Sequence, residues 1–263
     1  MGIGDELMAA GEAYYMHIAN GDVPVAILDK NDKPRVHPVW NRFPFINENA
    51  KASITNGGGA RPYMHGHNDE RFFYREYHPP WAWFADEMMT SNERTKADGY
   101  RRSLGDFWII EHRVKSKASV NKIYPVDKWA DVYRKMKANW FRLVCCDYGA
   151  GGDSIEGVIV PSFLTRTFDD VFPLMAAAQG YVGVEGAMHH LAGAMGKPAV
   201  VVRGSFISPG VTGYPNHTDV FVPHTELNVE SCGRRQFCAE CRAVMDAIMP
   251  DDVYSAIVSA FPR

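Results

Sequence analysis

The chain has no uninterrupted apolar run of about 18 residues, which is the length a membrane-spanning helix needs. Its N-terminus carries Asp5 and Glu6 where a secretory signal peptide would carry lysine or arginine. Cysteine is scarce, with five in 263 residues, and this argues against a disulfide scaffold. With 46% hydrophobic and 22% charged residues, the composition excludes a disordered or collagen-like chain. We therefore expect a globular cytoplasmic protein with no integral membrane segment.

Several catalytic signatures are also missing. No G-x-x-x-x-G-K-[ST] is present, which argues against a P-loop protein, and no G-x-G-x-x-G follows a strand pattern, which weakens a nicotinamide enzyme. The sequence has no G-x-S-x-G, the nucleophile elbow of α/β hydrolases. It also has no D-x-D, the usual carboxylate pair for a metal-bound sugar nucleotide. Any chemistry must therefore depend on less specific patterns.

Positive charge is concentrated in the middle of the chain. The formal net charge is −3, yet residues 94–142 hold thirteen lysines and arginines against five acidic residues. A basic middle between acidic ends favours a phosphate-bearing ligand near this segment. A solvated helix face around Lys128 to Lys137 explains the same charges, and both interpretations stay open.

The order of the predicted elements indicates an α/β fold. Strand and helix patterns alternate about five times between Asp106 and Ser205, which is typical of a mainly parallel sheet with helices on both faces. We expect a Rossmann-like domain over residues 106–263 and a shorter, less regular domain over residues 1–105. The predicted helices cover residues 4–20, 125–138, 170–179, 187–195, 236–249 and 251–260, and the predicted strands cover residues 23–29, 107–114, 141–147, 156–162, 181–185 and 198–205.

The strongest local candidate for a site is the turn Glu185-Gly186-Ala187, between a predicted strand and a predicted helix. Backbone N–H groups at a helix start bind anions, and the small residues Gly186 and Ala187 let a diphosphate approach the backbone. Glu185 suits sugar hydroxyls as an acceptor, and His190 can donate to a phosphate or orient Glu185. The alternative is an ordinary strand–helix junction at which His189 and His190 pack or cap.

Three polar residues follow neighbouring strands at the same predicted edge of the sheet. Lys122 lies in the first strand–helix connection, where a lysine can neutralise a phosphate, although most lysines are simply solvated. Arg203 and Ser205 end the predicted strand 198–205. Ligands of such folds bind at the carboxyl ends of the strands, so these residues join the candidate site.

The chain opens with small and acidic residues before its first predicted helix. Gly4 allows close approach of the backbone, and the carboxylate of Asp5 could serve as a general base. An N-cap without any chemistry explains Asp5 equally well.

Three cysteines lie close together near the C-terminus. Cys238 and Cys241 are three residues apart on a predicted helix, and Cys232 precedes them. Three thiolates and a fourth ligand suit a structural zinc ion, whereas buried free thiols are the alternative. The candidates for the fourth ligand are His217, His224, Cys145 and Cys146.

The segment 181–214 carries an extended pattern. A strand is followed by His190-Leu191-Ala192 in a short helix, then by Gly196-Lys197-Pro198, a hydrophobic strand and Gly204-Ser205. In this order the segment resembles glycosyltransferase family nine, the ADP-heptose:lipopolysaccharide heptosyltransferases and their relatives. Glu185-Gly186-Ala187 replaces the Asp-[ST]-Gly of that family, and this departure bears on the donor sugar.

Two shorter stretches extend the resemblance. Lys122, followed by Trp129, is similar to the family's Lys-x-Trp region with a wider gap, and Gly4-Asp5 is similar to its N-terminal Gly-Asp. The family usually has a hydrophobic strand before Gly-Asp. Either the first domain is reduced here, or the true start lies upstream.

The resemblance implies the GT-B architecture, two Rossmann-like domains facing a cleft, and transfer of a sugar from a nucleotide-diphosphate sugar. It implies that Asp5 deprotonates the acceptor hydroxyl for direct displacement with inversion. It also implies that no cofactor is needed for catalysis, because Lys122 and helix amides take the place of a metal. The implied donor-binding residues are Gly4, Lys122, Glu185, Gly186, Ala187, His189, His190, Arg203, Gly204 and Ser205.

The acceptor stays open. A sugar on a lipid or polysaccharide, as in lipopolysaccharide, is the family default, and the aromatic residues between Tyr63 and Phe84 would then line the acceptor side or form a core. The basic middle and these aromatics favour instead a phage-type enzyme that acts on a hydroxymethylated base in DNA. Glu185-Gly186-Ala187 favours a third class, a non-catalytic nucleotide- or glycan-binding protein of degenerate GT-B fold, and the cysteines a fourth, a zinc-stabilised interaction module.

Overall fold

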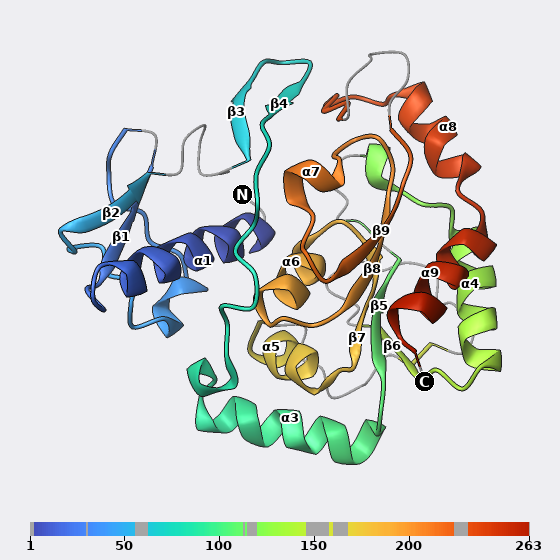
Figure 1. Ribbon diagram of the computed structural model, residues 1–263, viewed down its shortest axis with the longest axis horizontal. Helices are drawn as coiled ribbons and strands as arrows, with labels where there is room; N and C mark the ends of the chain where they lie inside the picture. Colours follow the sequence, from blue (N-terminus) through green and yellow to red (C-terminus); the bar gives the residue numbers. More distant parts are fainter. Residues whose placement is uncertain are drawn as a thin grey trace.

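A five-stranded parallel sheet forms the centre of the molecule (Figure 1). The computed structural model describes residues 3–29, 31–55, 63–112, 114, 120–145, 158–159, 168–223 and 231–262. The strands lie in the order β6 (Leu143–Cys145), β5 (Trp108–Glu111), β7 (Gly180–Val184), β8 (Ala199–Arg203) and β9 (His217–Phe221). Every neighbouring pair is parallel, with Ile109 opposite both Val144 and Tyr181. The predicted α/β class is confirmed.

Alternate side chains of the strands bury two separate cores, because successive residues of a strand point to opposite faces. Ile109 and Tyr181 pack with three helices on one face, whereas Ile110 and Val182 pack with helices on the other. The helices of the first face are α3 (Ser91–Leu104), α5 (Phe168–Ala177) and α6 (Ala187–Ala194), and those of the second are α4 (Val126–Ala138), α8 (Ala239–Ala247) and α9 (Pro250–Ala260). This three-layer arrangement is Rossmann-like.

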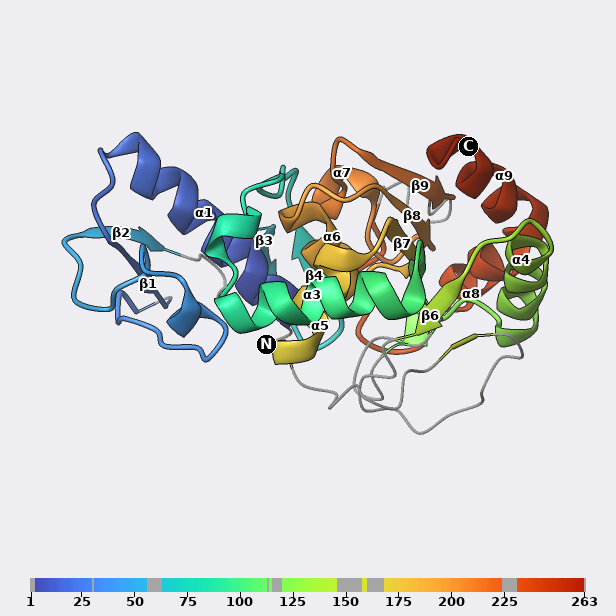
Figure 2. The same ribbon diagram turned by 90° about the horizontal axis from the view of Figure 1, so that it is seen from below.

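The first third of the chain is built around one long helix, α1 (Ile3–Ala19). Its small residues are buried, and it packs against both β1 (Val25–Leu28) and α6. Strand β1 pairs in parallel with β2 (Ala52–Thr55), at the end of the molecule away from the large sheet (Figure 2). Helix α1 therefore bridges the short β1–β2 unit and the face of the large sheet that α6 covers.

The remaining elements of this part are short. An antiparallel hairpin joins β3 (Met64–His67) and β4 (Phe72–Tyr74), and single 3-10 turns form η1 (Trp40–Arg42) and η2 (Asp86–Met88). The aromatics between Tyr63 and Phe84 divide into two groups. Trp83 and Phe84 lie in the main core, whereas Tyr63 packs with the hairpin and the C-terminal cysteines.

The predicted helices and strands are found with small shifts, and a few details are corrected. Pro173 lies inside α5, beyond the first turn of that helix. Asp5 lies inside the first turn of α1 and is not an N-cap, and Cys238 is the N-cap residue of α8 rather than part of the helix. Of the predicted strand 156–162, only Val158 and Ile159 are described, and Ile159 pairs in parallel with Val144.

Helix α3, strands β2, β3, β4 and β9, and the short helix α7 (Pro209–Thr212) were not predicted. Across the described ranges, no helix has both the length and the apolar character to cross a bilayer.

Candidate functional site

The turn between β7 and α6 has the open geometry expected of an anion site. Gly186 is the N-cap residue of α6, and no side chain caps this helix start. Gly186 and Ala187 are half-buried, whereas the flanking Glu185 and Met188 are buried. The helix start therefore keeps a partly exposed backbone at the carboxyl end of a central strand, where ligands of α/β folds bind.

Four side chains form a continuous polar chain beside this turn. Lys122 Nζ donates to Glu185 Oε2, His190 Nε2 lies 3.0 Å from Glu185 Oε1, and His190 Nδ1 lies 3.1 Å from the Tyr214 hydroxyl. Lys122 comes from the 3-10 turn η3 (Val120–Lys122), so the chain joins three separate segments. The sequence predicted Lys122, Glu185 and His190 for one site, and the structure brings them together.

The protonation of this chain follows from its charges. Burial by itself would raise the pKa of Glu185, but Lys122 and the hydrogen bond from His190 outweigh it and hold the pKa well below its usual range. Burial raises the pKa of Tyr214, which therefore keeps its proton. Because Glu185 is an anion, His190 Nε2 donates to it. His190 is thus held with its proton directed at Glu185.

Helix α1 brings Asp5 to the same place. The backbone of Gly4 lies so close to the His190 ring that a Cβ at Gly4 would come within 2.5 Å of Cδ2. Asp5 follows directly, is 7% exposed, and accepts a 2.7 Å hydrogen bond from the Tyr63 hydroxyl through Oδ1. The first turn of α1 therefore meets α6 at His190.

Arg203 and His189 form a second layer behind this site. Arg203 is 2% exposed and bonds to Asp219 through Nε and to Thr212 Oγ1 through Nη1 at 2.8 Å. Its Nη2 lies 3.2 Å from His189 Nε2. Burial and the charge of Arg203 hold the pKa of His189 well below its usual range, so the ring is neutral and accepts from the guanidinium.

Gly204 and Ser205 continue from β8 toward the C-terminal cysteines. A Cβ at Gly204 would come 3.0 Å from Met245 Cγ and 3.5 Å from the Asn121 carbonyl oxygen, so the loop packs tightly on η3. Ser205 is fully buried, and its hydroxyl lies 3.4 Å from Cys241 Sγ. Ser205 therefore contacts the cysteines directly.

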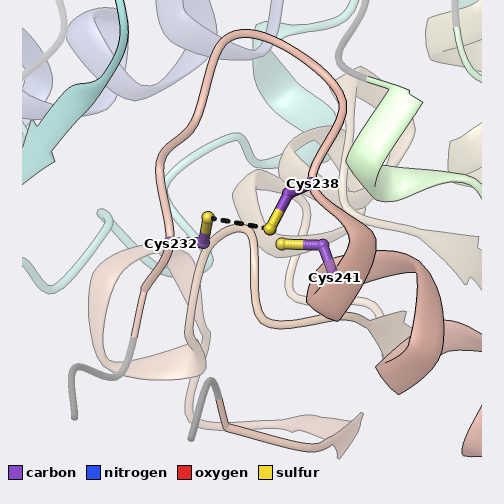
Figure 3. A group of neighbouring side chains, drawn as sticks. All are labelled: Cys232, Cys238 and Cys241. Carbon is purple, nitrogen blue, oxygen red and sulfur yellow. Dashed lines mark hydrogen bonds between the residues drawn. The ribbon is translucent and has the colours of Figure 1, made fainter. Parts of the chain in front are cut away.

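The three cysteines predicted as metal ligands converge on one point (Figure 3). Their sulfur atoms all lie within 4.8 Å of one another, and Cys232 Sγ is 3.7 Å from Cys238 Sγ. A hydrogen bond with Cys232 and burial raise the pKa of the Cys241 thiol.

Of the predicted fourth ligands, Cys145 lies in β6 and His217 packs against His189 and Tyr214, so neither joins this group. Cys146 and His224 fall outside the described residues.

Most of the basic side chains that the structure describes in the middle segment have partners within the fold. Among its described residues, Lys96 pairs with Asp170 and Lys122 with Glu185, while Arg142 bonds to the Leu104 carbonyl oxygen. Lys128 donates to the Ile248 carbonyl oxygen at the end of α8, and Lys135 pairs with Asp251 in α9. Neither a free cationic surface nor a purely solvated helix face describes Lys128 and Lys135, because both bind the C-terminal helices.

Sequence reasoning missed several residues of the site. Tyr63 was expected among the aromatic residues of the acceptor side or of a core, but its bond to Asp5 was not, and Tyr214 was given no role although it closes the segment that resembles the family. Glu111, at the end of β5, accepts from the Tyr181 hydroxyl at 3.1 Å and lies 3.7 Å from where a Cβ at Gly186 would be. A second carboxylate therefore lies beside the turn.

No protein-family model and no curated protein matches this sequence. Among solved structures, a glycosyl transferase family 9 protein from Veillonella parvula is 13% identical with a TM-score of 0.60, over 99% of this chain and 94% of that one. The E. coli heptosyltransferase WaaC with ADP is also 13% identical, with a TM-score of 0.59, over 99% and 98%. E. coli ADP-heptose lps heptosyltransferase II is 14% identical with a TM-score of 0.46, over 65% of this chain and 52% of that one, so the chain spans about half its length. The chain thus has the GT-B-like fold of the heptosyltransferases, and the resemblance to glycosyltransferase family nine is confirmed at the level of the fold.

Proposed function

We propose that the chain is a glycosyltransferase that moves a sugar from a nucleotide-diphosphate sugar to an acceptor hydroxyl. The observation that carries this proposal is the contact between Gly4 and His190. The same turn of α1 carries the carboxylate of Asp5, and α6 begins without a side-chain cap near the half-buried Lys122, a combination that suits a diphosphate donor. The fold of heptosyltransferases, one of them holding ADP, supports the same assignment.

The donor diphosphate binds at the start of α6. Backbone amides from Gly186 onward point toward it, and Lys122 exchanges its bond to Glu185 for a phosphate oxygen. Glu185, freed from Lys122, then accepts from a hydroxyl of the ribose or the sugar. Arg203 and His189 act from behind by fixing α6 and β8, because the polar contacts of Arg203 are with His189, Asp219 and Thr212 of this chain.

The transfer step needs one proton acceptor and one stabilised leaving group. Asp5 takes the proton of the acceptor hydroxyl, whose oxygen attacks the anomeric carbon from the face opposite the diphosphate, with inversion. The bond from the anomeric carbon to the diphosphate oxygen breaks, and the nucleoside diphosphate leaves with the electron pair. Lys122 and the α6 amides stabilise its growing negative charge, which makes the step independent of a catalytic metal.

For the acceptor we propose a glycan hydroxyl of the lipopolysaccharide or polysaccharide type. The aromatic side chains of Tyr63 and its neighbours in the β3–β4 hairpin lie on the Asp5 side. A DNA acceptor loses support, because the basic middle segment is largely engaged within the fold. Binding to duplex DNA that falls steeply with salt would restore it.

Two measurements test the proposal. A thermal-shift series with nucleoside diphosphates and their sugars should show selective stabilisation by one nucleotide, because a ligand of the native state raises stability. Asp5→Asn should then reduce donor turnover at least about 100-fold while the thermal shift by that nucleotide stays. Asp22→Asn, an exposed carboxylate just after the same helix, is the matched control and should leave turnover unchanged. Unchanged turnover in Asp5→Asn would favour the non-catalytic binder.

For the cysteines we propose a structural zinc ion. Cys232 Sγ and Cys238 Sγ are 3.7 Å apart. The edge of a tetrahedron with Zn–S bonds of about 2.3 Å is about 3.8 Å, so the sulfur atoms already have the spacing of zinc ligands. The Arg234 guanidinium, 3.9 Å from Cys238 Sγ, offsets part of the negative charge of three thiolates.

A further inference from the structure

The loop that carries the cysteines is bonded to the segment of the donor lysine. Asn121, which directly precedes Lys122, is 2% exposed. Its Nδ2 donates to the carbonyl oxygens of Arg234 at 3.0 Å and Gln236 at 2.9 Å, and its Oδ1 accepts from the Cys238 N–H at 2.8 Å. One buried side chain thus holds the backbone of residues 234–238 against η3.

A second set of bonds joins the same loop to the segment after β8. The Cys232 N–H donates to the Ser205 carbonyl oxygen at 2.6 Å, and the Gly233 N–H donates to that of Phe206 at 3.0 Å. Lys122 Nζ lies 5.2 Å from the centre of the Phe206 ring. The cysteine loop therefore supports Lys122 from two sides, through Asn121 and through Phe206.

The two ends of this loop, Cys232 and Cys238, meet at the group of three sulfur atoms. Residues 231–238 contain no helix or regular strand. Between neutral thiols the contacts are weak hydrogen bonds, whereas three bonds to one metal ion would cross-link Cys232, Cys238 and the first turn of α8. Asn121 and Phe206, which hold the Lys122 segment, are hydrogen-bonded to the backbone of the loop that this cross-link would fix.

We propose that metal binding by Cys232, Cys238 and Cys241 controls the donor site, because it fixes the loop that holds Lys122 next to Glu185. The ligand is a thiophilic divalent cation such as Zn²⁺. The metal acts on the donor lysine through Asn121 and takes no part in the transfer step. This proposal rests on the proposed function for its effect on donor binding, but its effect on the structure of residues 120–122 does not.

The test compares the full chain loaded with zinc and the same chain after chelation. Three quantities are measured, namely zinc per chain, backbone amide exchange of residues 120–122, and the dissociation constant of ADP. We expect one zinc per chain. Chelation should speed exchange at residues 120–122 by about tenfold and weaken ADP by about tenfold, the range seen when supports of a binding group are lost, and added zinc should reverse both.

Three variants separate metal binding from its transmission. Cys238→Ser should lose zinc and reproduce the chelated state, whereas Cys145→Ser, a buried cysteine outside the group, should behave as the wild type. Asn121→Ala should keep its zinc and yet show fast exchange at residues 120–122 that no longer responds to chelation. This last variant distinguishes a coupling through Asn121 from a general loss of stability.

The outcomes divide cleanly. A chain that holds no zinc after growth in zinc-supplemented medium overturns the proposal, and so does a chain whose exchange at residues 120–122 ignores zinc removal. If zinc and exchange behave as expected but ADP and the other nucleoside diphosphates do not bind, the proposed function fails while the coupling stands.

Discussion

Glu185 accepts a 3.0 Å hydrogen bond from His190 at one carboxylate oxygen and an ion-pair bond from Lys122 at the other. Both oxygens of this anion are therefore directed by cations or donors from different segments. In this ion pair, Glu185 neutralises the positive charge of Lys122. In the proposed donor complex, the diphosphate takes the place of Glu185 as the partner of Lys122.

Removal of the Lys122 charge should weaken the donor. Lys122→Met should raise the dissociation constant of the nucleoside diphosphate by about 10- to 100-fold, because a charge-assisted bond is lost. Isothermal titration calorimetry with the nucleotide selected by thermal shift measures this change. Lys128→Met removes an equal charge that binds the Ile248 carbonyl oxygen instead and should leave the affinity unchanged. Equal effects of the two variants would remove Lys122 from the site.

The close approach of α1 to His190 depends on the missing side chain of Gly4. Gly4→Ala should lower the free energy of unfolding and reduce transfer, because a Cβ would come 2.5 Å from His190 Cδ2 and push the helices apart. Gly99→Ala, in α3 with nothing within 4 Å, should instead stabilise the protein by about 0.5–1 kcal/mol. Urea unfolding of both variants checks the opposite signs. A stabilised Gly4→Ala would show that α1 does not lie against His190.

The buried histidines make stability fall on acidification. Burial and the charge of Arg203 lower the pKa of His217 to about 3. The unfolded chain, with a histidine pKa near 6.5, binds more protons between about pH 3 and 6.5. The contribution of His217 is complete above about pH 6.5 and declines below it, by up to about 1.4 kcal/mol per pH unit.

Unfolding by urea at pH 7, 6 and 5 tests this slope. His217→Gln should flatten the decline between pH 6.5 and 5. His78→Gln should not, since the His78 side chain is 88% exposed. A wild-type chain with the same stability at pH 7 and pH 5 would contradict the expectation.

The buried pair of Arg203 and Asp219 should show strong coupling. Arg203→Met leaves the Asp219 carboxylate without its cation and should destabilise the protein by about 3 kcal/mol, and Asp219→Asn should then restore part of that loss. A double-mutant cycle on the exposed pair Arg134–Asp131 is the comparison and should give at most about 0.5 kcal/mol. Similar coupling energies in the two cycles would argue against Arg203 as a structural support of α6.

Much of the second half of the fold could be predicted, because buried parallel strands are apolar on both faces and stand out from the helices between them. Strand β9 was missed for the opposite reason, since it is an edge strand of half-buried residues with no apolar pattern. Helix α3 is strongly polar and escaped the search for apolar periodicity. Its capping box, Thr90 with Glu93, was a local signal that could have revealed it.

The candidate site, like the fold, could be predicted only in part. Lys122, Glu185 and His190 each followed a predicted strand, so topology alone placed them at one edge of the sheet. Their bonds to each other, and the partners Tyr63 and Tyr214, depend on side-chain directions that spacing does not encode. Asn121 carried no signal at all, because its three bonds are to backbone groups more than a hundred residues away in sequence.

The packing of α1 on α6 has a consequence for biosynthesis. Helix α1 leaves the ribosome well before α6, the helix that covers it, which follows more than 160 residues later in the chain. At typical translation speeds the delay is on the order of ten seconds or more, during which Leu7 and Met8 lack their final neighbours. The nascent helix α1 must stay unaggregated for that time, and its contact with His190 forms only after α6 has been synthesised.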